Sequence, residues 1–515
     1  MKSLYLLIVL LQMTCFGNCF NILVVFPMPA PSHFILGNAL ARGLTEAGHD
    51  VTMVSPYEDK NPPNNGKYSN IVLEGNTQAQ SSAHRKINLF KFGKVNPFLN
   101  MKSMNYIGKS ATNSTFASDN FKKLLESGKK FDLVIVELFV DAGLGVLACH
   151  YQTPLVVFST LSSNYWVNSL VGNPSPSSYI PDLFLTYSSS MNMWQRFVNL
   201  LMYLAKDLNH RFSFLPTQIE LARKHFPKCV DDNGLITNVS LVLLNAHESI
   251  NDPVPYVPNM VNIGGYHVNP PKSLPKDLQE FCDSAKDGVV YFSMGSNLKP
   301  SDMSQDSKQA LLSALGKLKQ KVLWKWDEDH LPGKPENVRI AKWFPQQDIL
   351  AHPNVKLFIT HGGLLSTIET IYYGVPVLAL PVYGDQRINS AKAVAGGYAL
   401  SLSISELTEK DVSEALYELL NNPKYRENAK KRSAIMHDRK VKPMDLATYW
   451  IEYIIRHKGA PHLRVAALNL TWYQYYMVDI LLLLLCIGAS FLLTAYFIFR
   501  NLFCSRRTDS KLKKN

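Results

Sequence analysis

A short stretch of the chain carries residues that could bind a phosphorylated ligand. Residues 343–386 read WFPQQDILAHPNVKLFITHGGLLSTIETIYYGVPVLALPVYGDQ, with His361-Gly362-Gly363 between an apolar run and a helical pattern. A glycine turn before a helix offers free backbone N–H groups and the positive end of the helix dipole, and glycine lets the ligand approach closely. The pattern favours a phosphate site, although a Gly-Gly pair alone is more often a simple turn.

Side chains around this turn could bind a ribose, a sugar ring and a base. Glu369 lies roughly two turns further on, where its carboxylate could accept hydrogen bonds from vicinal ribose hydroxyls. Asp385 and Gln386 could do the same for a sugar ring. Trp343 offers a flat face for a base, and Gln346 follows it closely.

The elements that must position these residues are predicted by the same stretch. The apolar run 355–360 is rich in β-formers, as expected of a buried parallel strand. Residues 364–373 have apolar positions at helical spacing, and Gly374 and Pro376 end that helix. Residues 375–380 are the next strand. The candidate side chains are therefore expected just past the carboxyl ends of two strands.

The ordered set W-x-x-Q, T-H-G-G, S-x-x-E and P-x-x-x-D-Q closely resembles the signature of UDP-glycosyltransferases of the GT-B fold. Ser366 begins the S-x-x-E element. The resemblance extends from His33 to a C-terminal membrane anchor, and its details are similar to the insect branch of the family. It implies an α/β fold of two Rossmann-like, doubly wound domains facing a cleft, with a C-terminal transmembrane helix.

The resemblance adds further donor contacts. Gly295 and Ser296 resemble the family's second phosphate-facing turn, and Lys325 stands where the family often has arginine. UDP-sugar is then a donor substrate, and no cofactor is implied. Residues 327–329 (Asp-Glu-Asp) formally match a D-x-D metal motif of other glycosyltransferases, but a solvated turn is favoured, so no metal is expected.

His33 is the candidate general base, because the family places its base at this position. Histidine can remove a proton from an alcohol or phenol near neutral pH. In the family a nearby aspartate orients and charges this histidine. Here Glu137 holds the matching place, with Asp141 four residues on. We assign the supporting role to Glu137, with Asp141 as the alternative.

The resemblance implies inverting, metal-independent transfer of a sugar from UDP to a hydroxyl of a small lipophilic acceptor, as in detoxification. Glucose is the favoured sugar. The turn at 361–363 would stabilise the charge on the leaving diphosphate. One alternative is a transferase dedicated to an endogenous lipid or hormone. The other is a lumenal protein that binds UDP-sugar without turnover, and the presence of His33, Glu369 and Asp385 argues against it.

The two halves of the chain both contain strand patterns. A strand at 21–26, a helix at 35–47 and a strand at 51–55 predict a parallel sheet in the first half. Further strands are expected at 131–136, 155–159, 241–245, 288–293 and 321–326. Residues 57–130 are polar and are expected to be irregular. Residues 182–226 form an apolar, aromatic helical stretch, by default a core helix pair, with an acceptor pocket or membrane contact as the alternative.

These patterns predict seven segments. An apolar leader predicts a signal peptide, and six prolines and two adjacent glycines within residues 251–275 mark a domain boundary. The segments are a signal peptide (1–19), an N-terminal acceptor-binding domain (20–250), a linker or crossing (251–285), a C-terminal UDP-sugar-binding domain (286–440), C-terminal helices leading to the membrane (441–476), a transmembrane helix (477–499) and a basic cytoplasmic tail (500–515).

The charge and the cysteines exclude other classes. The formal charge of +12 includes six positive charges and one acid in the last sixteen residues, and nothing else resembles a nucleic-acid-binding motif. No nucleic-acid partner is expected, and a homo-oligomer is possible. Of seven cysteines, Cys149, Cys229 and Cys282 belong to the main body. One disulfide or buried free thiols would both fit.

The membrane segment predicts a topology. Residues 477–499 are long enough to span a bilayer with modest tilt, and the basic residues after them place the tail in the cytoplasm and the body in the lumen. Sequons at Asn113, Asn238 and Asn469 fall on the lumenal side. Lys511 and Lys513 resemble a di-lysine endoplasmic-reticulum retrieval signal, with a merely basic stop-transfer tail as the alternative.

Overall fold

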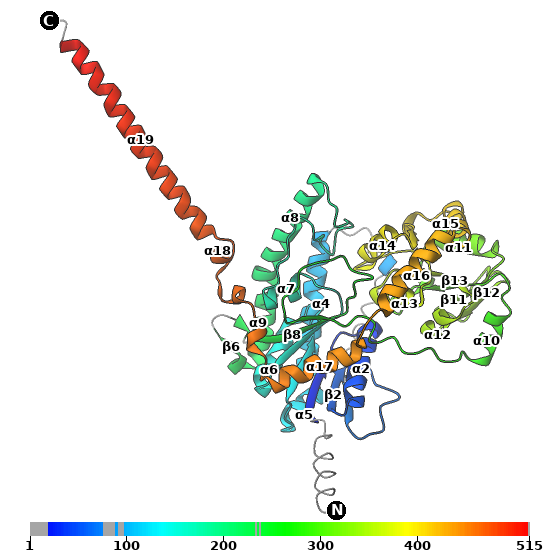
Figure 1. Cartoon of the computed structure of the whole chain (residues 1–515). Helices are drawn as coiled ribbons and strands as arrows, with labels where there is room; N and C mark the ends of the chain where they lie inside the picture. The colour runs from blue at the N-terminus through cyan, green and yellow to red at the C-terminus, as the bar shows by residue number, and fades with distance from the viewer. Residues whose placement is uncertain (1–18, 76–87, 91–96, 232–233, 236–237, 513–515) are drawn as a thin grey trace, which may run out of the picture. The chain divides into compact units, whose positions relative to one another are not determined.

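Two parallel sheets organise the chain (Figure 1). The computed structural model describes residues 19–75, 88–90, 97–231, 234–235 and 238–512. Both sheets belong to one unit that ends at Leu463, and a second unit begins at Arg464. The expected signal peptide lies, except for Cys19, outside the described residues.

The first sheet has seven strands in the order β3-β2-β1-β4-β5-β8-β9, all paired in parallel. Its inner strands are buried on both faces, which explains their continuous apolar sequences. The five strands predicted for this half are confirmed to within two residues at each end. The strands are β1 (Asn21–Val25), β2 (Asp50–Ser55), β3 (Tyr68–Val72), β4 (Leu133–Glu137), β5 (Leu155–Ser159), β8 (Val239–Leu244) and β9 (Met260–Asn262).

The second sheet has six parallel strands in the order β12-β11-β10-β13-β14-β15. They are β10 (Val289–Ser293), β11 (Lys321–Lys325), β12 (Val338–Ala341), β13 (Val355–Thr360), β14 (Val377–Ala379) and β15 (Ala399–Ser401). The helix predicted after β13 is confirmed as α13 (Leu364–Tyr373), and Gly374 ends it in the left-handed conformation at φ 64°. The strand predicted at 375–380 is shorter, at 377–379.

Each sheet has one place where the strand order reverses. In the first sheet β1 lies beside β4, and in the second β10 lies beside β13. Ligands of open α/β sheets bind outside the carboxyl ends of the strands at such a switch point. The residues that follow these four strands are therefore the natural place for a site.

Helices pack around both sheets. The first sheet has α2 (Pro31–Glu46), α4 (Pro97–Ala117), α5 (Asp119–Glu126), α6 (Val146–Tyr151), α7 (Tyr165–Val171), α8 (Met193–Asn209) and α9 (Leu215–His225). The second has α10 (Lys276–Asp283), α11 (Gln305–Gly316), α12 (Gln346–Ala351), α13, α14 (Gln386–Ala395), α15 (Glu409–Asn421) and α16 (Pro423–His437).

The segments expected as a linker or crossing and as C-terminal helices both contain elements that pack against the sheets. Strand β9 and helix α10 lie inside the expected linker 251–285, and they belong to the first and second sheets respectively. The next helix, α17 (Pro443–Arg456), does not simply lead to the membrane. It buries Ala447, Ile451 and Ile454 in the core of the first sheet, where Figure 1 shows it beside α2. Packing between distant segments decides both features.

Within the described part of residues 57–130, the predicted irregular structure is wrong for three segments. This range contains β3, α4 and α5. Helix α4 mixes its apolar residues with serine, asparagine and lysine, so its sequence gives a weak helical signal. It is stabilised by packing: Phe116 is almost fully buried, and α4 contacts α9.

The core helix pair predicted within 182–226 is also wrong. Helix α8 exposes its apolar side chains, with Met193 80%, Trp194 68% and Leu208 56% exposed. The helix instead buries Lys206, whose Nζ atom lies 2.6 Å from Asp182. The ion pair compensates the burial of the charge, so a polar residue takes the inner face.

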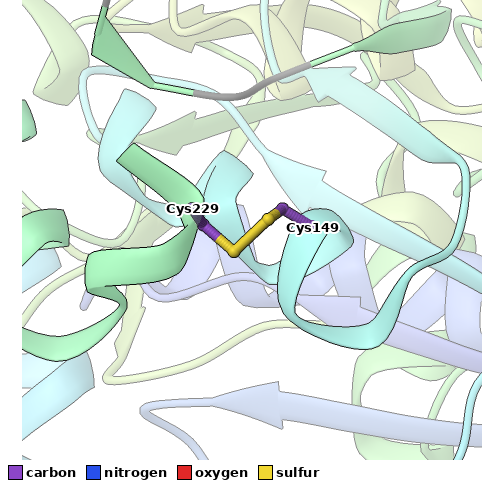
Figure 2. Close-up of a disulfide and its surroundings, with 2 residues drawn as sticks. All are labelled: Cys149 and Cys229. Atoms are coloured by element: carbon purple, nitrogen blue, oxygen red, sulfur yellow. A yellow bond between two sulfur atoms is a disulfide. The ribbon is translucent and has the colours of Figure 1, made fainter. Parts of the chain in front are cut away.

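The cysteine alternatives are resolved by the fold. Cys149 on α6 and Cys229 on a short 3-10 turn form a disulfide, which Figure 2 shows joining neighbouring segments of the first domain. Their Cα atoms are 5.8 Å apart. Cys282 is a buried free thiol in α10.

The second unit contains α18 (Trp472–Tyr475) and α19 (Val478–Leu512). Within α19, Val478–Phe503 has a mean hydropathy of 2.5 and is long enough to cross a membrane. The span predicted at 477–499 therefore coincides with an apolar helix. Lys513 and the last two residues lie outside the described residues.

Candidate active site

Two glycines make room for the imidazole of His361 at the switch point of the second sheet. A Cβ atom on Gly295, which follows β10, would lie 2.5 Å from His361 Cε1. A Cβ atom on Gly363 would lie 2.6 Å from His361 Nε2. Gly295 and Gly362 also have left-handed backbones, at φ 77° and 80°. The two predicted glycine turns thus form one site around His361.

His361 is a neutral hydrogen-bonding group. Its burial, and then the charge of Lys325, lower the pKa of the imidazole to about 4. Nδ1 lies 3.3 Å from the hydroxyl oxygen of Thr360. When that hydroxyl donates to Nδ1, the ring carries its hydrogen on Nε2 and can donate it to a phosphate oxygen.

Lys325 connects the second glycine turn with the predicted base-binding face. Its Nζ atom donates a hydrogen bond to the carbonyl of Gly295 at 2.9 Å and lies 4.4 Å from the centre of the Trp343 ring. Burial lowers the pKa of this ammonium group to about 8. Trp343 is 65% exposed, and Ser296 is exposed beside the turn. A cation and an exposed aromatic side chain therefore flank the turn.

The carboxylate of Glu369 is fixed by hydrogen bonds on the buried side of α13. Its carboxylate accepts hydrogen bonds from the side-chain amides of Gln346 and Gln347, the latter at 2.9 Å. Burial raises the pKa of Glu369, and both amides oppose this rise. Gln346 also donates to the hydroxyl of Ser366 at 3.2 Å. The sequence analysis missed Gln347, although it directly follows Gln346 in the motif.

Asp385 lies against the N-terminus of α13. Its carboxylate accepts hydrogen bonds from the backbone N–H of Leu364 and from the amide of Asn389, the latter at 2.7 Å. Burial nevertheless raises the pKa of Asp385. Asn389 also donates to the carbonyl of Gly362 at 3.1 Å, so it links the carboxylate to the glycine turn. The sequence analysis missed Asn389, which lies one turn after Asp385.

Gln386 has a structural contact in addition to any ligand contact. Its side-chain carbonyl accepts hydrogen bonds from the N–H groups of Val382 and Tyr383 at 2.8 and 3.0 Å. The side chain is 4% exposed. It fixes the loop that carries Asp385, and only its amide hydrogens are left for a ligand.

His33 lies at the switch point of the first sheet, in the first turn of α2. The helix was expected to begin at residue 35, but it begins at Pro31, because proline suits the first helical position. The Nδ1 atom of His33 forms a hydrogen bond with Oε1 of Glu137, the last residue of β4. The two strands on either side of the switch point thus bring together residues far apart in sequence.

The electrostatic surroundings strengthen His33 as a base. Burial opposes a charged imidazole, but the charge and hydrogen bond of Glu137 and then the charges of Asp141 and Asp385 raise the pKa of His33 above its usual value. Asp385 belongs to the second sheet's domain. The two domains therefore bring an imidazole and a carboxylate from different sheets within electrostatic reach.

A cavity of about 90 Å³ lies between the two domains. The first domain contributes aromatic side chains to its wall, including Tyr165, Trp166 and Tyr203. The second domain contributes Asp385 and Asn389. A ligand bound in this cavity would therefore contact Asp385, whose carboxylate is within electrostatic reach of His33.

Comparison with known proteins identifies the family. A family model described as "UDP-glucoronosyl and UDP-glucosyl transferase" matches residues 22–515. The chain belongs to this family. This UDP-glycosyltransferase is 37% identical over 487 residues to UDP-glycosyltransferase UGT5 of Dactylopius coccus, covering 93% of the chain and 91% of the relative. It is 34% identical over 522 residues to UDP-glucosyltransferase 2 of the same organism, covering 97% of each.

Solved glycosyltransferases share the GT-B fold. TcCGT1 in complex with UDP has a TM-score of 0.57 and 17% sequence identity, over 85% of this chain and all of that one. The expected fold of two Rossmann-like domains is thereby confirmed. The protein is a glycosyltransferase enzyme that uses a UDP-sugar donor.

The aspartates of the D-x-D motif in this UDP-glycosyltransferase contact other side chains and the backbone of the protein. Asp327 accepts hydrogen bonds from the backbone N–H and the hydroxyl of Ser301, at 3.0 and 2.5 Å. Asp329 forms an exposed ion pair with Lys342 at 2.8 Å. Within the described ranges, no group of three or more histidine, cysteine or acidic side chains could hold a metal ion. The expectation of no metal stays a prediction.

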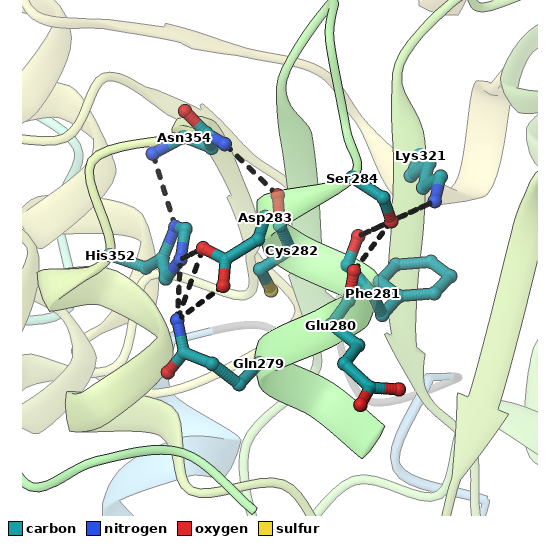
Figure 3. A network of polar contacts seen from close by, with 9 residues as sticks. All are labelled: Gln279, Glu280, Phe281, Cys282, Asp283, Ser284, Lys321, His352 and Asn354. Atoms are coloured by element: carbon teal, nitrogen blue, oxygen red, sulfur yellow. Dashed lines mark hydrogen bonds and ion pairs between the residues drawn. The ribbon is translucent and has the colours of Figure 1, made fainter. Parts of the chain in front are cut away.

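A polar network in the second domain lies at the amino ends of the strands, opposite the candidate site (Figure 3). His352 Nε2 lies 3.0 Å from Asp283, and Gln279 contacts both residues. Asn354 donates to the carbonyl of Cys282 at 3.0 Å. These residues precede β13, whereas His361 follows it. The network therefore fixes α10 to the sheet and is remote from the site.

Proposed function

We propose that this enzyme transfers a sugar, with glucose favoured, from UDP to a hydroxyl group of a small lipophilic acceptor, with inversion and without a metal. The observation that carries the proposal is the His33–Glu137 hydrogen bond within electrostatic reach of Asp385. The hydrogen bond supports a general base on the first domain, and Asp385 belongs to the donor site expected on the second domain. Glucose is favoured because an insect relative of matching length is named a glucosyltransferase.

The donor would extend along the carboxyl edge of the second sheet. The uracil ring of UDP would stack on Trp343, and Glu369 would accept hydrogen bonds from the ribose hydroxyls. The diphosphate would lie at the glycine turns around His361. Its charge would be stabilised by the turn's N–H groups and by the positive end of α13. The sugar would then reach Asp385 and Gln386.

The acceptor would bind between the domains with its hydroxyl beside His33, and its remaining part would extend into the cavity lined by Asp385. Its hydroxyl proton moves to Nε2 of His33, while its oxygen forms a bond to the anomeric carbon of the sugar. The bond from that carbon to the diphosphate breaks, and its electron pair leaves on UDP. A single displacement inverts the anomeric carbon. The phosphate turn stabilises the charge that grows on UDP, which is the role of preorganised donors in other transfers.

Assays of UDP release from UDP-glucose and UDP-glucuronate, with and without a panel of phenols and alcohols, test this function. We expect acceptor-dependent UDP release, fastest with UDP-glucose and unaffected by a chelator. Release only with one endogenous lipid or hormone would favour the dedicated transferase. Tight UDP-sugar binding without release under any condition would favour the non-catalytic alternative.

We also propose that the catalytic domains lie in the lumen of the endoplasmic reticulum. The apolar helix 478–503 and the basic tail after it support this orientation. Asn113, Asn238 and Asn469, the three sequon asparagines, are all exposed. Protease added to intact microsomes should remove a tag placed after residue 515 and spare the body. Replacing both Lys511 and Lys513 with serine should release the protein from this compartment, and an unchanged distribution would contradict retrieval.

A further inference from the structure

Asp141 acts electrostatically on His33, and the mechanism above gives it no step of its own. It precedes the short 3-10 turn η2 (Ala142–Gly145), and its side chain is 0% exposed, like that of Glu137. Its Oδ1 atom accepts a hydrogen bond from the backbone N–H of Phe139 at 3.1 Å. That bond holds the carboxyl group next to the end of β4, where Glu137 lies.

Each of the two carboxyl groups has one buried oxygen without a protein partner. These atoms are Oε2 of Glu137 and Oδ2 of Asp141. A buried polar atom without a partner costs about 1–3 kcal/mol, and an unpaired buried charge costs more. A proton on one of the two groups removes one charge and supplies one hydrogen-bond donor.

Among the described residues, no lysine or arginine forms an ion pair with either carboxyl group. His33 faces the pair from α2, and the buried phenol of Tyr266, after β9, is affected by the charge of Glu137. The carboxyl group of Asp385, in the second domain, also acts on His33, so three carboxyl groups influence the imidazole. Within the described part of the chain, the ion pair of Glu137 is with His33.

Two like charges in one buried site favour retention of a proton. Consistent with this geometry, burial and then the charge of Glu137 raise the pKa of Asp141 to about 7. The Phe139 N–H and His33 act in the opposite direction. The protonation change would therefore fall in the pH range in which His33 works as a base.

We propose that Asp141 is a positioning residue for the general base: its buried carboxyl group keeps a proton while His33 is neutral, and loss of that proton makes His33 a stronger base. This inference rests on the proposed function, because it concerns the same proton transfer. When His33 takes the acceptor proton, the imidazolium faces one carboxylate at low pH and two at high pH. The second negative charge stabilises the imidazolium.

Asp141→Asn tests the inference, because it keeps the shape of the side chain and fixes its charge at zero. Asp119→Asn is the matched control, since the side chain of Asp119 is 80% exposed. The rate constant kcat/KM is measured from about pH 5.5 to 9.5 with an aliphatic alcohol and with a dinitrophenol, which is ionised throughout. UDP-glucose binding is measured in parallel to show that each variant is folded.

With the alcohol, the acid limb of the Asp141→Asn profile should move to lower pH by about one unit. Its rate at the alkaline end should fall roughly two- to tenfold. The dinitrophenol rate should change little, and the Asp119→Asn profile should match the wild type. A variant profile that superimposes on an active wild type would overturn the inference alone, whereas a wild type without transfer would overturn the proposed function.

If Asp141→Asn does not fold, the pH profile of the wild type tests the inference instead. Its alcohol profile should then contain two ionisations, one for His33 and one for the carboxyl pair, and its dinitrophenol profile should contain neither. A single ionisation in the alcohol profile would overturn the role of Asp141.

Discussion

The imidazole of His361 packs against Gly295, so that a Cβ atom at position 295 would lie 2.5 Å from its Cε1 atom. The contact joins the turns after β10 and β13, the two strands at the switch point of the second sheet. The absence of a side chain at 295 is therefore required for the observed contact between the two turns.

Gly295→Ala should weaken UDP binding roughly tenfold or more, because a displaced phosphate-binding group loses its geometry. Gly333→Ala is the matched control. Gly333 has a similar backbone, at φ 72°, but the nearest atom to its added Cβ would be 3.9 Å away. Both variants should lose stability from the strained backbone, whereas only the first should lose affinity for UDP in calorimetry. Equal UDP affinities would show that His361 is not placed by Gly295.

Glu369→Ala should reduce UDP affinity by about 10- to 100-fold, the effect of losing hydrogen bonds to a charged group. A donor with deoxygenated ribose should bind both proteins similarly, because it lacks the hydroxyls that Glu369 would accept from. Glu414→Ala is the control, since its side chain is 68% exposed. If UDP and the deoxy analogue lose affinity equally in Glu369→Ala, the carboxylate does not contact the ribose.

Asp385→Ala should impair sugar transfer far more than UDP binding, because its carboxylate is within electrostatic reach of His33, whereas its hydrogen bond to the turn at residues 361–364 is a single contact. Gln386→Ala should also slow transfer, and in addition it should lower the melting temperature, since the side chain accepts two backbone hydrogen bonds. Transfer rates, UDP affinity and thermal melting separate these effects. Parallel losses of UDP affinity and transfer rate in Asp385→Ala would contradict a sugar contact.

His33→Ala should leave UDP-glucose binding nearly unchanged and reduce transfer to an aliphatic alcohol by roughly 10²–10⁴-fold. An acidic nitrophenol should suffer less, because it needs less help to lose its proton. Glu137→Gln should follow the same pattern more mildly, since it keeps the shape but removes the charge beside His33. Full activity of His33→Ala on alcohols would place the base elsewhere.

UDP affinity should decline as the pH rises through about 8, where the ammonium of Lys325 loses its proton. The direction follows from charge: the protonated lysine attracts the diphosphate, and the neutral amine does not. Lys325→Met should bind UDP more weakly at pH 7 and show a flatter pH profile. Binding is measured by calorimetry with full-length protein. An equally steep decline in the variant would exclude Lys325 as the titrating group.

The sequence by itself determined the local parts of this protein. The strand 355–360, the helix 364–373 and the glycine that ends it were predicted correctly, because apolar runs, helical spacing and left-handed glycines depend on neighbouring residues. The ordered motifs also indicated the family, which the comparison with known proteins confirms. The candidate donor residues were found in this way, apart from Gln347 and Asn389.

Only the tertiary structure decided which distant residues meet. The sequence analysis paired His33 with Glu137 only through the family resemblance; the two meet because β1 and β4 are neighbours in the sheet, which no local pattern specifies. The same holds for the Cys149–Cys229 disulfide and for α17, which returns to the first sheet. The buried Lys206 reverses the expected orientation of α8, because an ion pair can stabilise a charge inside a fold. Burial and pairing arise from packing between segments, so they appear only when the chain is folded.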